Sequence, residues 1–238
     1  VRASVDFDIA SLVHEKAKQK GLELLLNVGV EKFNDKGETI EVFLNNGTSV
    51  ETDAVILAIG VKPETKLAVE AGLEIGETRG ILVNEFLQTS NPDIYAVGDA
   101  IEVAHFINNK KVLIPLAWPA NRQGRIVADN IVLKNQYKYS GSMGSSILKF
   151  FEISLASIFL NKKKKKKFGI PYKTAIVTRG HHAGYYPGAK NLVLKLIFDE
   201  NGKIFGAQAV GEAGVDKRID VIATAIKGNL TVYDLPEI

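Results

Sequence analysis

The stretch Ile94-Tyr95-Ala96-Val97-Gly98-Asp99-Ala100 decides the fold class, because it is an apolar run that closes in Gly-Asp. Apolar residues without alternation are typical of a strand buried on both faces, as in a parallel sheet covered by helices. Ligands bind at the carboxyl ends of such strands, where a glycine admits a ligand and a carboxylate accepts hydrogen bonds from sugar or polyol hydroxyls. On the residues alone, two interpretations of Asp99 stay open: a polyol-binding carboxylate, or a turn residue that caps the next segment.

The residues before this stretch alternate between helix and strand signals. Asp8 is a plausible N-cap, and apolar residues follow it at helical spacing until Gly21. An Asn46-Gly47 pair between alternating apolar residues predicts a β-hairpin. The unbroken apolar run 54–59 predicts another strand covered on both faces. This block is therefore predicted to be part of an α/β unit whose sheet lacks its opening strand and helix.

A second α/β unit is predicted around the deciding stretch. A short helix ends at Gly72, and a small strand follows at residues 81–83. A longer helix opens near Pro119, a residue that suits the first helical turn, with Ile126, Val127 and Ile131 on one side.

The pattern changes after Tyr139, where residues 140–144 resemble a linker. Longer strands are predicted at residues 147–160, 192–198 and 204–210, the last two joined by the turn Asp199-Glu200-Asn201-Gly202. An amphipathic helix is predicted from about residue 216 to 227, followed by Gly228. Strands grouped together with a helix on one side favour an α+β domain.

The composition is that of an ordinary globular protein: 238 residues, 46% hydrophobic and 24% charged. It excludes disorder, collagen and coiled coil. The absence of cysteine excludes disulfide scaffolds, cysteine-ligated zinc and thiol catalysis within this polypeptide. No apolar run approaches the roughly 20 residues that span a bilayer, and no signal peptide opens the chain. We therefore expect a cytoplasmic protein with no membrane partner.

The net charge of +3 conceals a cluster of six lysines at residues 162–167. Without them the balance is 3 − 6 = −3, so the basic character comes from one patch. A solvated face is the favoured interpretation, because nucleic-acid binders interleave aromatic residues or form a stripe, and neither pattern is present. We expect no nucleic-acid partner. Nucleic-acid binding that falls steeply with salt would support the opposite view.

Five stretches, in chain order, resemble the FAD-dependent pyridine nucleotide-disulfide oxidoreductases. They are AVILAIGVKP at 54–63, TSNPDIYAVGDA at 89–100, PLAWPANRQGR at 115–125, HAGYYPGA at 182–189 and GVDKRID at 214–220. The last two resemble the coenzyme A-disulfide reductase and NADH oxidase branch. The resemblance implies a fold class: α/β, with partial NAD(P)-binding and FAD-binding Rossmann-like units followed by an α+β dimerisation domain. It implies three domains: residues 1–60 from the NAD(P)H-binding domain, 61–137 from the FAD-binding domain, and 138–238 for dimerisation.

The resemblance also implies residues that bind FAD. Asp99 would hold the ribityl chain, with Gly98 allowing the close approach, while Leu116 and Ala117 would meet the flavin ring. The complete set implied for cofactor binding is Thr89, Gly98, Asp99, Leu116, Ala117 and Asn121. Trp118 stands where relatives carry glycine, which leaves its role open.

Tyr185 and Tyr186 are the catalytic candidates that the resemblance implies. A phenol in this loop could protonate a leaving thiolate, and in this branch the loop resembles one that reaches the partner subunit's active site. The alternative is a pair of interface aromatics whose hydroxyls bond to backbone groups. His181 and His182 are adjacent and point in different directions in an extended chain, so we expect no metal site.

Two family features are absent from residues 1–238: a Gly-x-Gly-x-x-Gly fingerprint and the redox cysteine. We therefore expect a piece of a longer protein that is inactive alone. The intact homodimeric parent would use NAD(P)H and FAD to reduce coenzyme A disulfide. The alternatives are a water-forming NADH oxidase, with oxygen as acceptor, and a non-catalytic dimerisation module.

Overall fold

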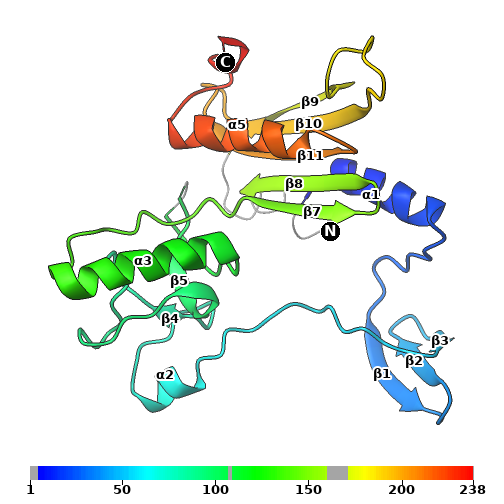
Figure 1. Ribbon diagram of the computed structural model, residues 1–238. Helices are drawn as coiled ribbons and strands as arrows, with labels where there is room; N and C mark the ends of the chain where they lie inside the picture. Colours follow the sequence, from blue (N-terminus) through cyan, green and yellow to red (C-terminus); the bar gives the residue numbers. More distant parts are fainter. Residues whose placement is uncertain (1–4, 107–108, 160–170, 238) are drawn as a thin grey trace. The chain divides into compact units, whose positions relative to one another are not determined.

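The computed structural model describes residues 5–106, 109–159 and 171–237 (Figure 1). The lysine cluster at 162–167 lies outside these residues. The chain divides into two compact units, one of residues 14–62 and one of residues 1–13 and 63–238.

The smaller unit is built on an antiparallel meander. Its strands are β1 (Val30–Asp35), β2 (Ile40–Leu44) and β3 (Ser49–Thr52), paired in that order. The Asn46-Gly47 turn lies between β2 and β3, with Gly47 at a φ of 84°. This confirms the predicted hairpin, because a left-handed turn residue is what a tight hairpin requires.

The predicted strand at 54–59 is wrong. These residues form no strand, and the side chains of Ile56 and Ile59 are 92% and 90% exposed. A strand exists only where a neighbour completes its backbone hydrogen bonds. None of the described strands pairs with this segment.

The larger unit contains an α/β part with its own core. It comprises α2 (Lys66–Glu70), β4 (Ile81–Leu82), the 3-10 turn η1 (Gly98–Ala100), β5 (Ile101–Ala104), β6 (Lys111–Val112) and α3 (Ala117–Leu133). Strand β5 pairs in parallel with β4 and antiparallel with β6. The predicted strand at 94–100 is wrong: among the described residues its only pairing is one bridge between Tyr95 and Gln88, and regular pairing starts after η1.

Helix α3 confirms the predicted helix, but its buried face differs from the apolar side that the sequence predicts. Pro119, Gln123, Ile126 and Asn130 are buried, whereas Ile131 is 61% exposed. The buried face therefore contains two amides, which pure apolar periodicity does not reveal.

The last part of the larger unit is a five-stranded antiparallel sheet in the order β7-β8-β11-β10-β9. Its strands are β7 (Ser146–Phe150), β8 (Ile153–Phe159), β9 (Lys173–Gly180), β10 (Asn191–Phe198) and β11 (Ile204–Gly211). The single strand predicted at 147–160 is wrong, because a turn at Phe151 and Glu152 divides it into β7 and β8. Phe151 adopts a φ of 49°, and neither turn residue is a usual turn former.

Two helices cover this sheet on opposite faces (Figure 1). Helix α5 (Val215–Lys227), which confirms the predicted C-terminal helix, buries Ile219, Ile222 and Ile226. The first part of α1 (Phe7–Gln19) packs Ile9, Ala10 and Val13 on the other face, and a short 3-10 turn, η2 (Leu235–Glu237), follows α5. The predicted fold class, α/β units followed by an α+β domain, is confirmed.

Candidate functional site

The first candidate site is the turn at Gly98 and Asp99. Gly98 has a φ of +79°, a backbone conformation that is strained for any residue with a side chain. The Asp99 carboxylate is exposed, and among the described residues no hydrogen bond or ion pair engages it. Asp99 therefore does not cap the following segment, and its two oxygens remain available to a ligand with hydroxyl groups.

Helix α3 begins beside this turn. The Cβ of Ala120 would lie 3.7 Å from a Cβ placed on Gly98, so the turn packs against the first turn of the helix. Leu116 is the N-cap residue in extended conformation, and Ala117 starts the helix. The first N–H groups of a helix have no partner within it and form a region of partial positive charge. An exposed carboxylate and a helix N-terminus are thus brought together.

Gln123 fixes this arrangement, and its role was not predicted from the sequence. Its side chain is almost completely buried, and its Oε1 accepts a 2.7 Å hydrogen bond from the Gly98 N–H. Burial raises the pKa of the neighbouring Tyr139, while hydrogen bonds with Gln123 and Ser142 oppose that rise. A glutamine on the buried, otherwise apolar face of α3 was the available sequence signal.

Other predicted cofactor residues have local roles. The Thr89 hydroxyl is buried in its own turn, where it donates to the carbonyls of Asn91 and Ile94 at 3.0 Å. The Asn121 amide donates back to the Ala117 carbonyl at 3.0 Å. Trp118 is 79% exposed.

A cavity of about 520 Å³ opens next to the helix start. Leu116 lines it from the α3 side, and Thr78, His105 and Met143 contribute from other segments. The hydrophobic lining with few polar groups is typical of small-molecule sites. Leu116 therefore lies at a position where a ring system could contact it.

The second candidate site is the loop between β9 and β10. Tyr185 and Tyr186 are 86% and 60% exposed, with ring centroids 5.2 Å apart. His182 lies edge-on to Tyr186 at 5.7 Å and 4.0 Å from His181. Among the described residues, no hydrogen bond, ion pair or ring contact joins this aromatic loop to the Asp99 turn, so within one chain the two candidate sites are separate.

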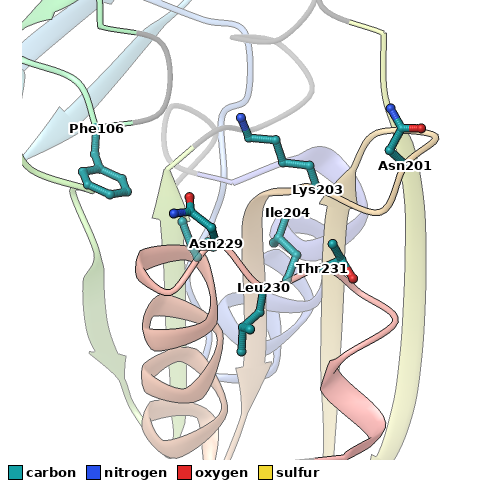
Figure 2. A pocket seen from close by; sticks show the side chains of 8 residues that line it. Phe106, Asn201, Lys203, Ile204, Asn229, Leu230 and Thr231 are labelled. Atoms are coloured by element: carbon teal, nitrogen blue, oxygen red, sulfur yellow. The ribbon is translucent and has the colours of Figure 1, made fainter.

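A further cavity of about 400 Å³ lies at the end of α5 (Figure 2). Ile204 and Leu230 form apolar lining, and the Lys227 Nζ lies 4.3 Å from the centre of the Phe106 ring. None of the predicted site residues lines this cavity.

The described part of the chain contains no cluster of three or more histidine, aspartate or glutamate side chains able to hold a metal ion. Among the same residues, every helix is too short or too polar to span a membrane.

Comparison with known proteins agrees with this geometry. Residues 1–124 match the family model "pyridine nucleotide-disulphide oxidoreductase", and residues 145–237 match the dimerisation domain of that family. The chain therefore belongs to the pyridine nucleotide-disulphide oxidoreductases, as the resemblance predicted.

Three curated relatives cover nearly the whole chain. NAD(P)H sulfur oxidoreductase (CoA-dependent) of Pyrococcus furiosus is 35% identical over 99% of this chain and 52% of the relative. NADH oxidase of Methanocaldococcus jannaschii is 35% identical over 97% and 51%. Coenzyme A disulfide reductase of Staphylococcus aureus strain JH9 is 33% identical over 98% and 52%. The chain thus spans about half the length of the curated relatives it matches.

Solved structures of related oxidoreductases superpose closely on this chain. Reduced Bacillus anthracis CoADR-RHD superposes with a TM-score of 0.95 at 49% identity, covering 99% of this chain and 42% of that one. Water-forming NADH oxidase from Lactobacillus brevis, bound to NADH, gives 0.91 at 28% identity, covering 98% and 51%.

Proposed function

We propose that residues 1–238 serve as the C-terminal part of a flavin-dependent disulfide reductase acting on coenzyme A disulfide. The balanced reaction is NAD(P)H + H⁺ + CoA-S-S-CoA → NAD(P)⁺ + 2 CoA-SH. The observation that carries the proposal is the exposed Asp99 carboxylate, which no described residue pairs with, next to a glycine in the left-handed conformation and beside the α3 N-terminus.

The residues of this turn fit FAD. Asp99 would accept hydrogen bonds from ribityl hydroxyls, and Gly98 would admit the chain to the backbone. Leu116 and Ala117 would contact the ring, with Asn121 one turn further along α3 and Thr89 holding the preceding turn. When bound, FAD would supply hydride acceptance from NAD(P)H and electron delivery to a disulfide. The α3 N-terminus would stabilise negative charge on the ring.

The exposed tyrosine loop supports a role at a second chain. Tyr185 or Tyr186 would donate a phenolic proton to the leaving coenzyme A thiolate, in the active site of the partner subunit. The match of residues 145–237 to a dimerisation domain supports the homodimer that this requires. The domains we propose remain residues 1–60 for NAD(P)H, 61–137 for FAD and 138–238 for dimerisation.

The second candidate function is a water-forming NADH oxidase, supported by the 35% identity to the NADH oxidase of Methanocaldococcus jannaschii and by the structural match to the water-forming NADH oxidase from Lactobacillus brevis. Both functions use the same flavin site and differ in the electron acceptor.

The test is a steady-state assay of the complete natural polypeptide that contains this chain, with NADH and NADPH compared as donors. Coenzyme A disulfide, polysulfide and oxygen are offered separately as acceptors. We expect coenzyme A disulfide to give the highest kcat/KM. Faster turnover with oxygen alone would favour the oxidase, and no donor oxidation with any acceptor would contradict both candidates.

A further inference from the structure

The tyrosine loop is attached to the first turn of α5. The Arg218 Nη2 donates a 2.8 Å hydrogen bond to the carbonyl oxygen of His181, 37 residues earlier in the chain. Hydrogen bonds from a charged donor are about twice as strong as neutral ones. This contact joins the 214–220 motif to the residue that directly precedes the 182–189 motif, and among the described strands no pairing connects the two motifs.

Gly214 makes the contact possible. It is the N-cap residue of α5 with a φ of 72°, and a Cβ there would lie 3.2 Å from the His181 Cβ and 3.5 Å from the Arg218 Nη1. The glycine therefore leaves the space through which the arginine reaches the loop.

The base of the loop is closed at the same residue. The His181 N–H donates to the Lys190 carbonyl at 2.9 Å, and the Lys190 N–H donates to the His181 Nδ1 at 3.1 Å. From His181 the rings of His182, Tyr186 and Tyr185 follow one another at 4.0, 5.7 and 5.2 Å between centroids. These successive ring contacts link the anchored residue His181 to both tyrosines.

The exposed tip has little other support. Tyr185 and Tyr186 are largely exposed. The tip is held by short-range bonds, from the Tyr186 N–H to the Ala183 carbonyl at 3.0 Å and from the Ala189 N–H to the Tyr186 carbonyl at 3.4 Å, and the His182 Nδ1 lies 3.0 Å from the Ala183 carbonyl. Loops with few buried contacts open easily, so a fixed tyrosine position depends on the base.

We propose that Arg218 is a positioning residue, which holds the His181 carbonyl so that the loop presents Tyr185 and Tyr186 in one arrangement to the coenzyme A disulfide site. The catalytic role of this positioning rests on the proposed function. The hydrogen bond from Arg218 to the His181 carbonyl does not depend on it.

The first experiment measures hydrogen exchange in the 238-residue chain. Arg218→Met should speed exchange of the Tyr186 and Lys190 amides about tenfold, because a bond from a charged group is lost. The amides of α5 should be unaffected. Arg218→Lys should give an intermediate effect, because lysine retains a charged donor. Lys217→Met, which removes the same charge at the exposed neighbouring position, should change nothing.

The second experiment measures kinetics in the complete natural polypeptide. Arg218→Met should lower kcat for coenzyme A disulfide about tenfold, because the proton donor is misplaced. The rate of flavin reduction by NAD(P)H should stay unchanged, and Arg218→Lys should recover part of kcat.

The outcomes separate the two claims. Unchanged loop exchange in Arg218→Met, or equal acceleration throughout α5, would overturn the anchor. A looser loop with unchanged kcat would overturn the catalytic role. A looser loop in a protein whose wild type does not turn over coenzyme A disulfide would refute the proposed function and leave the anchor standing.

Discussion

At the scale of single residues, Asp99 contributes a charge that the fold does not use. Because its carboxylate has no partner among the described residues, Asp99→Ala should change the free energy of unfolding by no more than about 0.5 kcal/mol. In the complete polypeptide, the same change should lower the flavin bound per chain. Chemical denaturation and the absorbance of the flavin measure the two effects. Asp93→Ala, an exposed carboxylate in the preceding turn, is the matched control and should alter neither.

Two glycines test the packing at the same scale. A Cβ on Gly76 would lie 2.3 Å from the carboxylate of Glu102, which is almost fully buried and accepts hydrogen bonds from Thr78. Gly76→Ala should therefore destabilise the chain by about 1–3 kcal/mol through overpacking. A Cβ on Gly124, inside α3, would meet nothing within 4 Å. Gly124→Ala should stabilise by up to about 1 kcal/mol, and an equal loss in both variants would contradict the packing around Glu102.

At the scale of elements, a buried lysine joins α1 to the antiparallel sheet. The Lys195 side chain on β10 is fully buried, and its Nζ lies 2.7 Å from Asp6 and 2.6 Å from Asp8. Gln208 on β11 completes the arrangement, because its Oε1 accepts from the Asp6 N–H at 2.8 Å.

Removal of this buried cation should be costly. Lys195→Met should destabilise by about 3 kcal/mol, because the buried Asp6 carboxylate and the partly exposed Asp8 carboxylate lose their counter-charge. Lys66→Met, which breaks an exposed pair with Glu70 at 3.9 Å, should cost at most about 0.5 kcal/mol. Urea denaturation with amide exchange in α1 measures both. A Lys195→Met variant as stable as the wild type would show that apolar contacts alone hold α1.

Elements with local signals were predictable from the sequence. The hairpin at Asn46-Gly47 and the helix before Gly228 follow from turn chemistry and periodicity within a few residues. The runs 54–59 and 94–97 predicted burial that the structure does not show, because residues 54–59 are all exposed and residues 94–97 are at most partly buried. A strand also needs a neighbour, which a local pattern cannot specify. The turn at Phe151 and Glu152 lacks a usual turn residue, so the two strands were predicted as one.

The residues of the candidate sites also divide into those with a local sequence signal and those defined by long-range contacts. Gly98 and Asp99 were predictable because a Gly-Asp pair after an apolar run carries its own chemistry. Gln123 and Arg218 were not, because their contacts reach residues 25 and 37 positions away.

At the scale of the whole molecule, residues 1–238 should form a dimer that binds little or no FAD. The dimerisation region is present, whereas no Gly-x-Gly-x-x-Gly anchor for a cofactor pyrophosphate occurs in the sequence. Sedimentation and the visible spectrum after addition of FAD check this. A yellow complex that survives gel filtration, or NADH oxidation by this chain alone, would contradict the expectation.

The central claim is that Asp99 holds the ribityl chain of a bound flavin. A crystal structure of the complete polypeptide with FAD tests it most directly. We predict a carboxylate oxygen of Asp99 within about 3 Å of a ribityl hydroxyl oxygen, at hydrogen-bond distance. A flavin bound elsewhere, or an Asp99 side chain paired with a protein cation and turned away from the cofactor, would contradict the account.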